Sequence, residues 1–133
     1  MKRVVVTGIG GITAFGREWA KIKSAFQRGQ NAVRSMDWAQ QYPELEAQLG
    51  APITDYTPPA HWTRKQLRSM GRVSHLCVDA AERALTDAGL LGNEEIKDGR
   101  MGVACGSSTG STKDIRDVGE LLISGTSPHF SAN

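Results

Sequence analysis

Apolar residues recur at intervals of three and four in three stretches of the chain, the spacing that places side chains on one face of an α-helix. This spacing predicts helices over residues 18–27, 73–88 and 112–124. Gly29 and Gly89 closely follow the first two, in good positions to end them. The apolar face of the middle helix holds mostly small residues: Val73, Leu76, Cys77, Ala80, Ala81, Ala84, Leu85 and Ala88. Such a face predicts very close packing against a sheet or another helix.

Two continuous apolar runs, residues 4–6 and 101–105, are each followed by a glycine-rich turn. Runs of this kind are typical of strands that are buried on both faces. Between them, prolines punctuate residues 31–59, where one short helix is predicted over 44–49. The order of strand, helix, helices, strand and helix predicts an α/β fold with a parallel sheet.

Length, charge and cysteine usage narrow the class of protein. The chain has 133 residues, the size of one domain, and its net charge of +2 does not indicate nucleic acid binding. The apolar run after Lys2 and Arg3 is too short for a signal peptide or a membrane-spanning helix, so we expect a cytoplasmic protein without a membrane partner. The two cysteines show no spacing typical of a disulfide framework or a zinc site, so no metal is predicted.

The segment Gly8-Ile9-Gly10 follows a predicted strand and precedes a predicted helix, as the glycines of a dinucleotide-binding turn do. The dinucleotide fingerprint is G-x-G-x-x-G, and Thr13 stands where its third glycine is required. No second strand ends in an acidic residue at the right distance. A tight strand-to-helix turn therefore explains the glycines better, and a dinucleotide-binding oxidoreductase remains an alternative.

Candidate catalytic side chains are few. Cys77 lies on the apolar face of its helix, which favours an inert, structural thiol. Cys105 ends the second predicted strand beside a small polar loop, where activation as a nucleophile is conceivable. The three histidines, His61, His75 and His129, form no triad or metal-binding pattern. His75 falls off the apolar face of its helix and is expected in solvent.

Four short motifs occur in collinear order: Val5-Val-Thr-Gly-Ile-Gly10, Arg64-Lys-Gln-Leu-Arg-Ser-Met70, Gly106-Ser-Ser-Thr-Gly110 and Ser127-Pro-His-Phe130. Together they resemble the elongating β-ketoacyl-acyl-carrier-protein synthases, condensing enzymes of the thiolase superfamily, from about Lys2 to the end of the chain. The resemblance implies that residues 1–133 are the incomplete N-terminal part of a β-ketoacyl synthase domain. The implied fold is α/β, a thiolase-like layered α/β/α/β/α architecture with a mostly parallel sheet.

The resemblance also implies an activity for the full-length enzyme, which is decarboxylative Claisen condensation in fatty-acid or polyketide/polyene synthesis. Acyl carrier protein is the implied partner, the family forms homodimers, and no cofactor is implied. The family's nucleophilic cysteine and two histidines lie in later motifs that are absent here. The chain is therefore expected to end before the catalytic cysteine, to hold no catalytic residue and to be inactive alone. A non-catalytic carrier-binding module is a further alternative.

A basic cluster marks the start of a helical segment that Thr63 is placed to cap. Its members are Arg64, Lys65, Arg68 and Arg72. The i, i+4 spacing of the three arginines predicts one helix face, which taken alone indicates a solvated basic surface. The resemblance implies that this segment binds the acidic helix of acyl carrier protein, with Ser69 replacing a frequently basic position.

The loop after the second predicted strand is made of small polar residues, Ser108 and Thr109 among them. The resemblance implies that this loop lines the acyl pocket and that Phe130 reaches the pocket of the neighbouring subunit. From the residues alone, Phe130 is explained equally by ordinary loop packing. Thr109 stands where the family commonly has a larger apolar side chain, which argues against a standard saturated-chain specificity.

Overall fold

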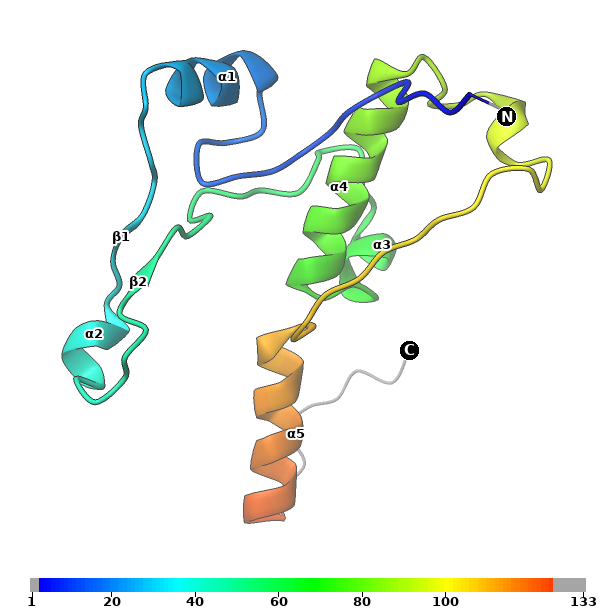
Figure 1. Ribbon diagram of the computed structural model, residues 1–133. Coiled ribbons are helices and arrows are strands. Elements are labelled where there is room, and N and C mark those ends of the chain that lie inside the picture. Colours follow the sequence, from blue (N-terminus) through cyan, green and yellow to red (C-terminus); the bar gives the residue numbers. More distant parts are fainter. Residues whose placement is uncertain (1–2, 126–133) are drawn as a thin grey trace.

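The computed structural model describes residues 3–125, with α4 in the middle of the molecule (Figure 1). The elements in chain order are α1 (Trp19–Gln27), β1 (Arg34–Ser35), α2 (Trp38–Gln41), β2 (Leu49–Gly50), α3 (Arg64–Arg68), α4 (Arg72–Asp87), the 3₁₀ helix η1 (Glu94–Ile96) and α5 (Thr112–Ser124). An arm made of α1, α2, β1 and β2 lies to one side of α4, and α5 lies beyond the α3 end of α4 (Figure 1). Among these residues the buried apolar side chains are only Ile22, Ala25 and Trp62, so the chain has a small core.

The three helices predicted from apolar spacing are confirmed as α1, α4 and α5. Gly89 follows the C-terminal end of α4 with φ 69°, the left-handed conformation in which glycine ends a helix without strain. The predicted cap of α3 is confirmed as well. The Thr63 side chain accepts a hydrogen bond from the backbone N–H of Gln66, whose side chain accepts one from the backbone N–H of Thr63.

The helix predicted over residues 44–49 is wrong. Leu49 instead lies in β2, which pairs antiparallel with β1 in the register Arg34 with Gly50 and Ser35 with Leu49. The helix of this region is α2, and Trp38 at its start donates from Nε1 to the carbonyl oxygen of Ala47 at 2.9 Å. Cross-strand pairing and this tryptophan anchor hold the backbone extended where local propensity indicated a helix.

The strands predicted over residues 4–6 and 101–105 are also wrong for this chain. Both segments lack ladder hydrogen bonds, and within residues 3–125 the one sheet is the short β1–β2 pair. The predicted burial of both segments is wrong as well, since Val4 is 92% exposed and Val103 is 91% exposed. A strand needs a neighbouring strand to satisfy its backbone groups, and the described residues supply none. The predicted mostly parallel sheet is therefore not formed by these residues.

The close packing predicted for the small face of α4 is confirmed, but the predicted partner is wrong: the opening segment with its glycines packs there, and it is neither a sheet nor a helix. A Cβ atom built on Gly8 would lie 2.3 Å from the carbonyl oxygen of Ala84, and one built on Gly10 would lie 2.2 Å from that of Ala80. Only glycine allows the backbone to approach the helix this closely. Between the two glycines, the N–H of Ile9 donates to Oδ2 of Asp87 at 2.9 Å, which fixes the crossing point.

Within the described part of the chain, every helix is too short or too polar to cross a bilayer.

The glycine contact gives a testable prediction. Gly10→Ala should lower the free energy of unfolding by about 1–3 kcal/mol, because the added methyl group overpacks the backbone of α4. Gly11→Ala is the matched control, since its Cβ would meet no atom within 4 Å, and it should change stability by less than about 0.5 kcal/mol. Urea unfolding followed by circular dichroism measures both. Equal losses in the two variants would show that Gly10 does not contact α4.

Candidate functional site

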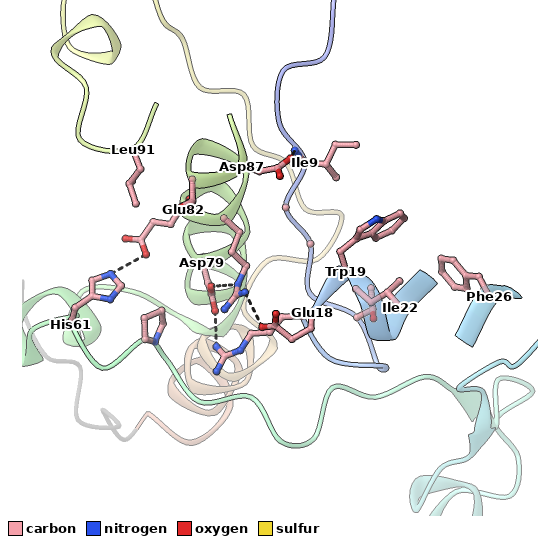
Figure 2. A pocket seen from close by; sticks show the side chains of 17 residues that line it. Ile9, Glu18, Trp19, Ile22, Phe26, His61, Asp79, Glu82, Asp87 and Leu91 are labelled. Atoms are coloured by element: carbon pink, nitrogen blue, oxygen red, sulfur yellow. Dashed lines mark hydrogen bonds and ion pairs between the residues drawn. The ribbon is translucent and has the colours of Figure 1, made fainter. Parts of the chain in front are cut away.

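A cavity of about 920 Å³ lies between the opening segment, α1 and α4 (Figure 2). Apolar side chains from four parts of the chain line it, among them Ile9, Trp19, Pro59 and Leu91. Trp19 is 64% exposed and Phe26 is 60% exposed, so the apolar wall on the α1 side is open. Acidic residues of α4 line the opposite wall.

The charged centre of this cavity is Asp79, whose residue is only 1% exposed. Its carboxylate accepts from Arg17 Nη1 at 3.0 Å and from Arg83 Nε at 2.8 Å, as the dashed lines in Figure 2 show. Arg17 also donates to the carbonyl oxygen of Thr57 at 3.1 Å, and Arg83 lies 3.4 Å from Glu18. The network therefore ties the opening segment, α4 and the chain before α3 together.

Sequence reasoning missed this network. A signal that could have found part of it is the acidic residue followed by arginine four positions later on the same helix, as in Asp79 and Arg83. No local pattern brings Arg17 to the same carboxylate, because 62 positions separate the two residues.

Tyr56 extends the network on the side of α3. Partial burial, followed by the negative charge of Asp79, raises the pKa of the Tyr56 phenol. Its hydroxyl donates to the carbonyl oxygen of His75 at 3.1 Å, and the guanidinium carbons of Arg17 and Arg72 lie 6.0 Å and 5.9 Å from its ring centre. The tyrosine thus stays protonated at neutral pH and acts as a hydrogen-bond donor.

A histidine and a carboxylate meet at the edge of the cavity. His61 Nε2 lies 3.0 Å from Glu82 Oε2 (Figure 2). The indole N–H of Trp62 donates to Glu82 Oε1 at 2.9 Å. His75, expected in solvent, is instead half-buried, with its ring centre 5.9 Å from that of Trp62. Tertiary contact with Trp62 overrides its place off the apolar face. His129 lies outside the described residues.

The structure separates the basic cluster into two parts. Arg64, Lys65 and Arg68 lie on α3 and are exposed. The single helix face predicted to include Arg72 is wrong, because α3 ends at Arg68 and Arg72 begins α4. The Arg72 side chain turns toward the carbonyl oxygen of Ile53 and the ring of Tyr56.

Two of the residues predicted for an acyl pocket lie in the described part of the chain. Ser108 and Thr109 are exposed in the loop before α5, which Ser107 braces by accepting from the N–H of Gly110 at 3.0 Å. Neither lines the cavity of Figure 2. Phe130 lies outside the described residues. Within residues 3–125, no group of three or more His, Cys, Asp or Glu side chains could hold a metal ion.

Comparison with known proteins identifies the family to which the chain belongs. The family model of the β-ketoacyl synthase N-terminal domain matches residues 1–130. The chain belongs to the β-ketoacyl synthase family. A crystal structure of a β-ketoacyl synthase from Burkholderia phymatum STM815 is 50% identical and superposes with a TM-score of 0.89 over 100% of this chain and 33% of that chain.

Curated relatives of this β-ketoacyl synthase chain agree. The 3-oxoacyl-[acyl-carrier-protein] synthase 2 of Synechocystis sp. is 30% identical over 122 residues, covering 92% of this chain and 29% of the relative. Nodulation protein E of Rhizobium leguminosarum bv. trifolii is 38% identical over 105 residues, covering 79% of this chain and 25% of the relative. The chain thus spans about a third or less of the length of these proteins, and the recognised resemblance is confirmed.

The Asp79 network gives a second prediction. Asp79→Ala should cost stability at the lower end of about 3–5 kcal/mol, because two arginines lose their buried partner while keeping 32% and 30% of their side chains exposed. Asp98→Ala, which removes the exposed pair with Arg100, is the control and should change stability far less. Urea unfolding compares them. A loss no larger for Asp79 than for Asp98 would show that the buried network does not hold the fold.

Proposed function

We propose that this chain is the N-terminal part of an enzyme that elongates acyl chains by decarboxylative Claisen condensation. Its contributions are a docking surface for acyl carrier protein and one wall of an acyl pocket. Membership of the β-ketoacyl synthase family and relatives named 3-oxoacyl-[acyl-carrier-protein] synthase support the reaction class. The complete enzyme is a cytoplasmic homodimer in this proposal, acting in fatty-acid or polyketide/polyene synthesis without a cofactor.

The chemistry of that reaction belongs to groups that this chain does not supply. A cysteine takes the acyl chain as a thioester, and malonyl-carrier loses carbon dioxide to give an enolate that attacks the thioester carbonyl. Two histidines and an oxyanion hole stabilise the charge that develops on oxygen. None of these roles is assigned to a residue of this chain, and Cys105 has no family role as the nucleophile.

The observation that carries the docking proposal is the exposed basic surface of α3, formed by Arg64, Lys65 and Arg68. A capping box fixes the start of this helix, and His75 of α4 lies 3.2 Å from the carbonyl oxygen of Leu67. Trp62 before the helix is buried and anchored to Glu82. The cations are therefore presented from a fixed helix, which favours recognition of an acidic partner helix.

Arg72, at the start of α4, contributes to this surface without being part of its exposed face. Its side chain is committed to Ile53 and Tyr56, so it adds positive charge at the base of α3 without reaching outward. Ser108, Thr109 and Phe130 are proposed for the acyl pocket on the resemblance of their motifs, with Thr109 setting depth or polarity at a position where the family commonly has a larger apolar residue.

The alternatives differ in what they require of the chain. A non-catalytic carrier-binding module needs only the α3 surface, so carrier binding without turnover by any longer form would favour it. A dinucleotide site needs the third glycine of its fingerprint, where this chain has Thr13. The close contact of Gly8 and Gly10 with α4 gives these glycines a structural role, which favours the condensing-enzyme proposal over the oxidoreductase.

The chain alone should have no condensing activity. The reason is that the family's cysteine and histidine motifs are absent from its sequence. The chain is incubated with acyl-carrier and malonyl-carrier, and the β-ketoacyl product is followed by mass spectrometry. Turnover that disappears in Cys105→Ala would contradict the proposal, because it would make Cys105 the nucleophile.

The docking surface gives a further prediction. Reversing Lys65 and Arg68 to Glu should weaken binding of acyl carrier protein about tenfold, and added salt should shrink the difference, because exposed charge contacts are individually modest and screened. Fluorescence anisotropy of a labelled carrier measures the affinity. Lys23→Glu with Arg34→Glu makes the same charge change on α1 and β1 and should have a much smaller effect. If both double variants weakened carrier binding equally, the effect would come from net charge and not from a docking surface on α3.

A further inference from the structure

His61, at the edge of the cavity, has no part in the function proposed above. It lies in a turn that closes where the backbone N–H of Trp62 donates to the carbonyl oxygen of Pro59 at 3.1 Å. The His61 side chain is exposed, and its Nε2 lies 3.0 Å from Oε2 of the half-buried Glu82 (Figure 2). The turn thus brings an ionisable ring to a carboxylate of α4.

Glu82 uses both of its carboxylate oxygens for the segment in front of α3. Oε2 faces His61, while Oε1 accepts the indole N–H of Trp62 at 2.9 Å. Trp62 is buried and directly precedes Thr63, the residue that caps α3. The orientation of this one carboxylate therefore fixes the start of the helix that carries the exposed basic surface.

The charge of the pair depends on His61. Histidine is the side chain whose charge ordinarily changes between pH 5 and 8. The protonated ring forms an ion pair with Glu82, whereas the neutral ring offers only an uncharged hydrogen bond. The other charged groups that line the cavity have partners of their own: Asp79 binds Arg17 and Arg83, Arg83 also pairs with Glu18, and Asp87 accepts from the backbone N–H of Ile9. Loss of the proton from His61 therefore weakens the hold on Glu82 and leaves the Asp79 network intact.

We propose that His61 is a positioning residue for the carrier-docking surface of α3, and that its protonated ring fixes the Glu82 carboxylate that holds Trp62 in front of that helix. This inference rests on the proposed function, because it concerns the surface at which acyl carrier protein docks. A helix whose start is fixed loses less conformational freedom when the carrier binds, so protonation of His61 strengthens docking.

Carrier affinity at pH 6 and pH 8 tests the role of His61 in the complete 133-residue chain. Fluorescence anisotropy of labelled acyl carrier protein should show binding about threefold tighter at pH 6, the size expected of one partly exposed ion pair. His61→Gln keeps a polar side chain without the charge and should bind nearly equally at the two pH values. His129→Gln, a change outside the described residues, should keep the wild-type ratio. A ratio that His61→Gln leaves unchanged would overturn the proposal.

Glu82→Gln tests whether His61 acts through this carboxylate. The amide oxygen can still accept the indole N–H of Trp62, but it forms no ion pair. Glu82→Gln alone and combined with His61→Gln should remove the pH dependence to the same extent as His61→Gln, because the changes delete one shared interaction. Additive effects of the two changes on carrier affinity would overturn the proposal, since His61 would then act as a charge independent of Glu82.

The indole N–H signal of Trp62 in nuclear magnetic resonance spectra gives a readout without the carrier. Trp62→Phe assigns this signal among those of the three tryptophans. The signal should move between pH 6 and pH 8 in the wild-type chain and move much less in His61→Gln. Movement that remains in that variant belongs to His75, whose ring centre lies 5.9 Å from that of Trp62. The full wild-type movement in His61→Gln would contradict the proposed link.

Reversing the charges of Lys65 and Arg68 separates this inference from the function on which it rests. If the reversal weakens carrier binding while His61→Gln leaves the pH ratio unchanged, the docking surface stands and His61 has no positioning role. If the reversal has no effect on carrier binding, the proposed docking surface is wrong, and the role of His61 is wrong with it.

Discussion

The contact on which the rest of this structure depends is the crossing of the opening segment over α4 at backbone distance. Gly8 and Gly10 leave no room for a side chain, and Ala80 and Ala84 of α4, with Ala88 directly after it, are small enough to let the backbone approach. The Asp87 carboxylate then binds the N–H of Ile9. From this crossing the chain reaches Arg17 beside Asp79, so the buried charge network depends on the same contact.

The chain is held together by polar anchors more than by an apolar core. Asp79 joins the opening segment to α4, and Glu82 holds Trp62 in front of α3. Val4 and Val103, by contrast, expose apolar surface in this chain. The similar proteins are three to four times longer, so they have additional residues that could cover such a surface. The exposed cations of α3 are thus positioned by anchors within this chain.

The features that the sequence predicted correctly are those that local interactions determine. The helices α1, α4 and α5 follow from spacing and end signals, and the α3 cap follows from Thr63. The predicted strands are wrong because a strand needs a pairing neighbour, which an apolar run does not specify. The predicted basic face is wrong at Arg72 because the helix is interrupted between α3 and α4, so the Arg72 side chain points in a different direction from those of α3. Asp79 was missed because its partner Arg17 is distant in sequence. The family, by contrast, was correctly recognised from four short motifs whose order carries more information than their propensities.

The most direct test of this account is amide hydrogen exchange of the chain, measured residue by residue by nuclear magnetic resonance. The N–H of Ile9 donates to Asp87 at the crossing point, whereas Val5 lies in an extended segment without ladder hydrogen bonds. The account predicts that the Ile9 amide is protected together with the amides of α4, while the Val5 amide exchanges at a rate close to that of an unstructured peptide. An Ile9 amide that exchanges as fast as that of Val5 would contradict it.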